Sequence, residues 1–108
     1  MSNVSKHYKN KRDKREKLIH EHIHDDGNII DGFIVDKGHK NGAEVHSITD
    51  NGIIIIENYH TGKLITKLIA RPHQIIRYYE STGRQPPPEY EQILYLAEWH
   101  KSLNYNHV

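Results

Sequence analysis

The chain has 108 residues, 27% of them charged and 35% hydrophobic, with a formal net charge of +1. This length predicts one domain with a modest core, and the absence of cysteine excludes disulfides, thiolate metal sites and cysteine nucleophiles. No apolar run reaches the roughly 20 residues that a membrane-spanning helix needs, and the first residues lack the apolar segment of a signal peptide. We therefore expect a cytoplasmic protein.

The positive charge is concentrated at the N-terminus. Residues 1–17 contain seven Lys and Arg side chains against two acidic ones, so the rest of the chain has a net negative charge. Such a segment can bind phosphate backbones in a salt-dependent way, or it can simply keep a small protein soluble. We expect a basic, partly flexible arm over residues 1–17 and a single α+β domain over residues 18–108.

Four segments rich in β-forming residues follow the arm. They span residues 29–36, 43–49, 53–56 and 63–70. Asn51 and Gly52 form a strong hairpin turn, Gly62 can take the positive φ that closes the next loop, and Gly32 indicates a bulge or a close backbone approach. Strands joined by short turns are antiparallel, so we expect a meander whose isoleucine strand is buried on both faces.

Two helices are predicted after the strands. Pro72 suits a first helical turn, and Gly83 stands where a C-terminal cap is expected. The prolines at 86–88 form a stiff spacer before the last helix. The fold prediction is therefore α+β: a four-stranded antiparallel meander sheet with an N-terminal helix or flexible arm and two C-terminal helices packed on the sheet.

The chain has seven tyrosines but one phenylalanine. Aromatic rings beside arginines can stack on single-stranded bases or anchor an interface, whereas core packing is the simpler interpretation. We expect Tyr79, Tyr90 and Trp99 in the core, and Tyr78 and Tyr95 at the surface.

Ten histidines are many for this length, and the densest group is His20, His22 and His24, followed by two aspartates. Imidazole and carboxylate groups are good ligands for Zn²⁺ or Ni²⁺. No H-E-x-x-H pattern is present, however, and alternating histidines near a helix end often face solvent. We predict no metal and no other cofactor, and leave open whether this cluster binds one.

A second polar group lies on the predicted sheet. A metal-free ribonuclease needs a general acid or base and cations that stabilise the charge growing on the phosphate. His46 can serve as the acid or base, and Lys67 and Arg71 as the cations.

The strand that carries His46 is followed by the pattern Asn-x-x-Thr-Gly-Lys-x-x-Thr over residues 58–66. This arrangement, over roughly residues 43–71, resembles the sheet of the barnase/EndoU/RelE-type toxin nucleases. In that group a long helix precedes the sheet, whereas here it is a short polar candidate, and two extra helices follow. The resemblance implies a metal-independent ribonuclease.

The segment ITDNGIIII…TGKLITKLIARPHQIIRYY also resembles small uncharacterised proteins carried by phages and mobile elements of low-GC Gram-positive bacteria. This second resemblance implies a setting in which small proteins bind nucleic acid, inhibit a host protein, or act in defence and counter-defence.

We predict a small non-enzymatic binding protein that engages nucleic acid, or a nucleic-acid-handling host protein, through basic residues. One alternative is the toxin-type ribonuclease, and another is a homodimeric interaction protein with no nucleic-acid role. The residues expected to contact nucleic acid are Lys9, Lys11, Arg12, Lys14, Arg15, Lys17, Arg71, Arg77 and Arg84.

Overall fold

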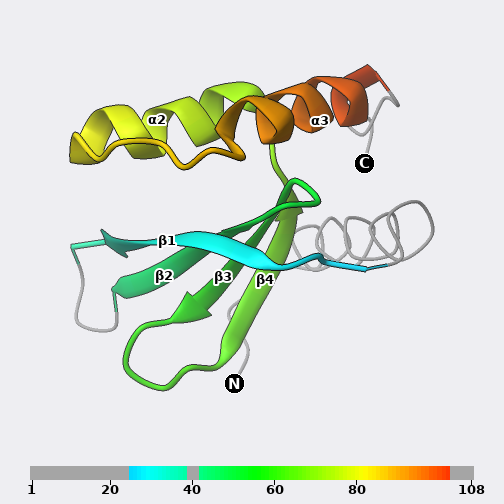
Figure 1. Ribbon diagram of the computed structural model, residues 1–108. Helices are drawn as coiled ribbons and strands as arrows, with labels where there is room; N and C mark the ends of the chain where they lie inside the picture. The colour runs from blue at the N-terminus through cyan, green and yellow to red at the C-terminus, as the bar shows by residue number, and fades with distance from the viewer. Residues whose placement is uncertain (1–24, 39–41, 103–108) are drawn as a thin grey trace.

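The computed structural model describes residues 25–38 and 42–102. The basic arm and the cluster of His20, His22 and His24 therefore lie outside the described residues. The elements are β1 (Ile29–Asp36), β2 (Ala43–Thr49), β3 (Ile53–Asn58), β4 (Leu64–Ile69), α2 (Pro72–Thr82) and α3 (Tyr90–Ser102). The two helices form a layer on one side of the sheet (Figure 1).

The strands form a four-stranded antiparallel sheet in the order β1-β2-β3-β4, which confirms the predicted meander and the α+β class. Gly52 has a φ of 78° in the turn between β2 and β3. The Thr49 hydroxyl oxygen accepts hydrogen bonds from the backbone N–H groups of Asn51 and Ile53, at 3.3 and 3.2 Å. The turn is thus closed by a side chain as well as by glycine geometry.

Both faces of β3 are covered. Ile53, Ile54 and Ile56 are buried, as expected for a run of β-branched residues in a central strand. Burying one such side chain contributes about 1.5–3 kcal/mol, so this strand accounts for a large share of the core energy. The core between sheet and helices consists of Phe33, Ile48, Ile54, Ile56, Ala70, Ile75, Tyr79, Ile93 and Ala97.

Local sequence explains where α2 begins and ends. The backbone N–H of Arg71 donates to the Gln74 side chain at 2.9 Å, and Pro72 occupies the first turn. Gly83 takes a left-handed φ of 66°, and its N–H donates to the carbonyl of Tyr79 at 2.9 Å. Both predicted boundary residues are therefore confirmed.

The aromatic predictions are confirmed in part. Tyr79 is buried and Tyr95 is exposed, as expected, and Tyr90 is half-buried. Tyr78 is half-buried rather than a surface residue, because its ring stacks on Phe33 with 4.9 Å between ring centroids.

The prediction that Trp99 belongs to the core is wrong, since 49% of this residue is exposed. The buried positions of α3 are Ile93, Ala97 and His100. His100 takes the inward position of the last turn, and Trp99 consequently lies on the outer side of the helix.

The predicted features of β1 also need one refinement. The register shift lies between Ile29 and Asp31, before Gly32. Gly32 is instead the point where the Arg84 side chain reaches the backbone, which is the second of the two expected alternatives. None of the described helices is both long enough and apolar enough to cross a membrane.

Candidate functional site

The first polar cluster consists of Glu44 and His46 on β2 and Tyr78 on α2. His46 and Glu44 share the helix-covered face of the sheet, with 2.9 Å between His46 Nε2 and Glu44 Oε1. His46 Nδ1 contacts the Tyr78 hydroxyl. A carboxylate can only accept, so we assign the proton of the neutral ring to Nε2, and the Tyr78 O–H then donates to Nδ1.

Burial, together with the negative charge of Glu44, raises the pKa of Tyr78 to about 12. The phenol therefore remains protonated at neutral pH and can act as the donor to His46. The His46 residue is only 7% exposed, and both of its ring nitrogens have a protein partner. This cluster links β2 to α2, and neither ring nitrogen is directed at solvent as a general base requires.

The structure does not bring the expected catalytic residues together. His46 pairs with Ile56, which pairs with Thr66, so Lys67 lies on the opposite face of the sheet from His46. Arg71 lies five residues beyond Thr66 along the chain. At the rise per residue of a strand, roughly 15 Å therefore separates Arg71 from the position of Thr66, which is level with His46.

Several of the described cations have an acidic partner. Lys67 Nζ lies 2.6 Å from Asp26 Oδ2, and Lys37 Nζ lies 3.8 Å from Glu44 Oε1. These side chains face carboxylates and are less available to a phosphate ligand.

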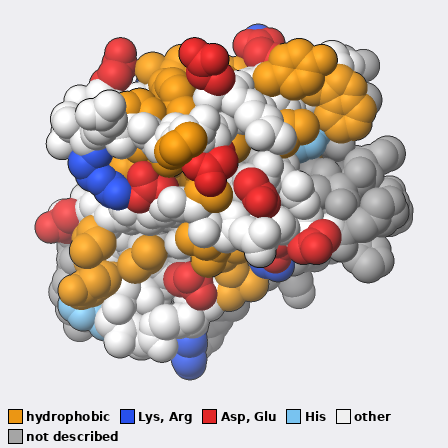
Figure 2. All heavy atoms as spheres, in the orientation of Figure 1, with side chains coloured by type: hydrophobic (Ala, Val, Ile, Leu, Met, Phe, Trp, Pro, Cys, Tyr) orange, Lys and Arg blue, Asp and Glu red, His pale blue; other side chains and the backbone are white. Residues whose placement is uncertain are grey.

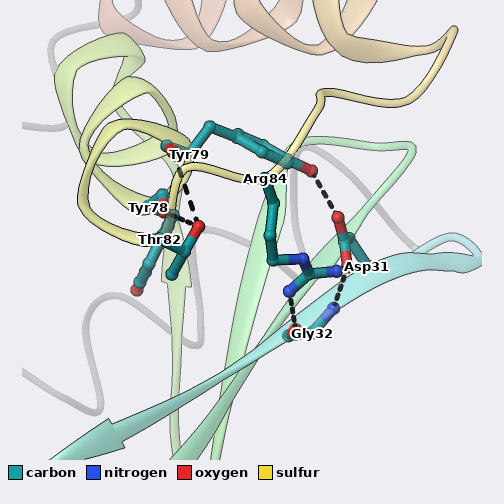
Figure 3. Close-up of polar contacts among 6 residues, drawn as sticks. All are labelled: Asp31, Gly32, Tyr78, Tyr79, Thr82 and Arg84. Atoms are coloured by element: carbon teal, nitrogen blue, oxygen red, sulfur yellow. Dashed lines mark hydrogen bonds and ion pairs between the residues drawn. The ribbon is translucent and has the colours of Figure 1, made fainter.

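Arg84 is the most firmly held of the cations (Figure 3). Its guanidinium pairs with Asp31, donates to the Gly32 carbonyl at 2.8 Å, and lies 4.5 Å from the centre of the Phe33 ring. The Tyr79 hydroxyl donates to the other Asp31 oxygen at 2.9 Å, and burial followed by this hydrogen bond raises the pKa of Tyr79. The sequence predicts that Arg84 contacts nucleic acid; its side chain is exposed, and its guanidinium already has a carboxylate and a backbone carbonyl as partners.

Arg71, Arg77 and Arg84 are all exposed, so burial does not distinguish them. Within residues 25–38 and 42–102, Arg71, Arg77 and Lys101 form no ion pair, whereas Arg84 pairs with Asp31. His73 and Arg77 are four residues apart on α2, so they lie on the same side of the helix.

A hollow of about 300 Å³ lies where the first turn of α2 meets the last turn of α3. Its polar lining residues are Arg71, His73, Lys101 and Glu98, and Pro72 and Ile76 supply the apolar part. Sequence reasoning missed His73 and Lys101, because only the packing of the two helices places Lys101 beside Arg71. We call Arg71, His73, Arg77 and Lys101 the α2 cationic surface.

Another face of the molecule carries mainly acidic and apolar side chains (Figure 2). On the face shown in Figure 2, acidic side chains outnumber Lys and Arg, and apolar side chains gather over α3, where Tyr95 and Trp99 are exposed. The described residues hold no group of three or more His, Cys, Asp or Glu side chains that can bind a metal ion. The α2 cationic surface is therefore the best candidate site for an anionic ligand among the described residues.

The chain matches no protein-family model, no curated protein and no solved structure. The functional argument therefore depends on the geometry of this chain alone.

Proposed function

We propose that the protein binds the phosphate backbone of nucleic acid through the α2 cationic surface, without catalysing a reaction. The observation that carries the proposal is the hollow of about 300 Å³ that Arg71, directly before α2, and His73 of α2 share with Lys101 of α3. Exposed cations from two elements around one depression can contact the same phosphate from two sides.

The charges of the neighbouring elements support this choice of surface. Lys37, Lys67 and Arg84 each have a carboxylate partner, whereas Arg71 and Lys101 have none among the described residues. A phosphate can engage these two side chains without first breaking an ion pair. Arg77, one turn or more along α2, extends the surface for an adjacent phosphate.

Glu98 also lines the hollow, and its charge opposes an anion there. The proposal therefore predicts both substitutions that weaken binding and one that strengthens it. Removing a cation should weaken binding, and Glu98→Gln should strengthen it.

The experiment is fluorescence anisotropy of the full chain with labelled single- and double-stranded DNA and RNA, at about 50 and 200 mM salt. We expect Arg71→Ala and Lys101→Ala each to weaken binding about three- to tenfold and to reduce the salt slope by about 0.9 for each phosphate that is no longer neutralised. Glu98→Gln should bind about two- to threefold more tightly.

Lys63→Ala is the matched control. Lys63 is an exposed cation in the β3–β4 loop, at the opposite end of the sheet from the helices (Figure 1). A second control replaces the expected arm contacts, Lys9, Lys11, Arg12, Lys14, Arg15 and Lys17, with glutamine to measure the contribution of the arm. The proposal fails if the affinity does not depend on salt, or if Arg71→Ala and Lys101→Ala bind as tightly as Lys63→Ala.

A further inference from the structure

β1 lies at one edge of the sheet, and every second residue of it directs its backbone N–H and C=O out of the sheet. The carbonyl of Ala43 accepts a hydrogen bond from the N–H of Tyr59, so Ala43 faces β3 rather than β1. Alternate residues of β2 share this direction. The β1 residues opposite them, whose backbone groups consequently face outward, are Gly32, Ile34 and Asp36.

Side chains occupy both outward groups of Gly32. Its N–H donates to Asp31 Oδ1 at 2.8 Å, and its carbonyl accepts from Arg84 Nη1 at 2.8 Å. Figure 3 shows the guanidinium of Arg84 beside this stretch of β1, held there by Asp31. An arginine that follows α2 thus covers part of the strand edge.

The next part of the same edge pairs with no other described strand. Ile34 is 64% exposed, and Asp36 is exposed as well. Exposed hydrophobic side chains on an uncovered edge strand are a template for pairing with another strand, and proteins usually protect such edges. Within the part of the chain that the structure describes, the side chains of Arg84 and Asp31 protect this edge, and no strand pairs with it.

We propose that the β1 edge is a self-association surface guarded by Arg84. With the guanidinium on Gly32, the edge remains unpaired. When the guanidinium is displaced, β1 pairs antiparallel with β1 of a second copy.

A second copy is the occupant that the sequence of β1 favours. In an antiparallel pair with its two-fold axis at Ile34, the Ile34 side chains of the two copies lie opposite each other and lose their exposure. Gly32 lies opposite Asp36 of the second copy, so no two acidic residues face each other. The strand is thus self-complementary in this register.

Arg84 and Asp31 together occupy the groups that would form most of the hydrogen bonds available in that register. Opposed outward-facing residues exchange two bonds, so the pairing provides about six, of which about two remain while both Gly32 residues are occupied. Displacing Arg84 frees the two Gly32 carbonyls and about doubles the number of intermolecular bonds, from about two to about four. The last two form when the Gly32 N–H leaves Asp31 Oδ1.

The experiment is sedimentation equilibrium of the full chain as wild type, Arg84→Ala and Arg84→Lys. The lysine variant keeps the charge but cannot bridge Gly32 and Asp31 as the guanidinium fork does, and it serves if the alanine variant does not fold. Lys63→Ala removes an exposed cation that lies outside β1 and is the matched control.

We expect the Arg84 variants to dimerise at least about tenfold more tightly than wild type, and Lys63→Ala to behave as wild type. Ile34→Lys added to the Arg84 variant should restore the wild-type mass, because a lysine on the edge opposes pairing. Unchanged mass in a folded Arg84 variant, or a dimer that persists with Ile34→Lys, would overturn the proposal. Neither result depends on nucleic-acid binding.

Discussion

Arg84 and Arg71 lie 13 residues apart, on either side of α2, and their surroundings are opposite. Arg84 has a carboxylate, a backbone carbonyl and an aromatic ring around its guanidinium. Arg71 lies exposed at the rim of a hollow beside Lys101, and no ion pair holds it within the described residues. The difference shows that charge and helix position do not identify a binding residue, because tertiary partners decide which cation is available.

The largest effect is expected in the cluster of Asp31, Tyr79 and Arg84, which we call the closed cluster. Asp31→Ala removes the acceptor of the Tyr79 hydroxyl and the partner of Arg84, so a buried donor and a guanidinium are left without their carboxylate. We expect a loss of about 3 kcal/mol in the free energy of unfolding, measured by urea denaturation. Glu80→Ala, an exposed position on α2, should stay within about 0.5 kcal/mol of wild type, and equal losses would contradict the closed cluster.

The Glu44–His46–Tyr78 cluster should give an intermediate effect. Tyr78→Phe removes the hydroxyl that donates to His46 Nδ1 and leaves the ring on Phe33, so we expect a loss of about 1 kcal/mol by the same measurement. A stability equal to wild type would show that this hydrogen bond contributes nothing.

The same cluster predicts how stability changes in alkaline solution. The pKa of Tyr78 is raised to about 12 in the folded state, so the unfolded state loses this proton first as the pH rises above about 10. The stability that the neutral phenol contributes is therefore fully present below about pH 10 and is lost as the pH approaches 12. Tyr78→Phe should show a shallower fall in the unfolding free energy over this interval than wild type does.

The smallest effect on stability is expected at the α2 cationic surface. Arg71→Ala and Lys101→Ala should each change the unfolding free energy by less than about 0.5 kcal/mol, since neither side chain has an ion pair among the described residues. A loss of more than about 1 kcal/mol would place Arg71 with Arg84 as a structural residue.

The sequence predicts the sheet well because its determinants are local. Gly52 closes the β2–β3 turn, the isoleucine run forms the central strand, and Pro72 and Gly83 bound α2, all within a few residues of the features they control. Local rules of this kind need no knowledge of the tertiary structure.

The candidate site could not be predicted in the same way, because it depends on contacts between residues that are far apart in the sequence. Asp31 and Arg84 are 53 residues apart, so nothing near Arg84 in the sequence distinguishes it from Arg71. The same reason hides the proximity of Lys101 to the start of α2. The sequence misplaces Trp99 because either side of α3 offers an apolar stripe, and packing selects the side with His100.

The most direct test of the account is an NMR titration of the ¹⁵N-labelled full chain with a short single-stranded RNA. The account predicts that the largest amide shifts occur at His73, Arg77 and Lys101, with little change at Gly32 and Arg84. Shifts concentrated at Gly32 and Arg84 instead would mean that Arg84 contacts the RNA, and would contradict the account.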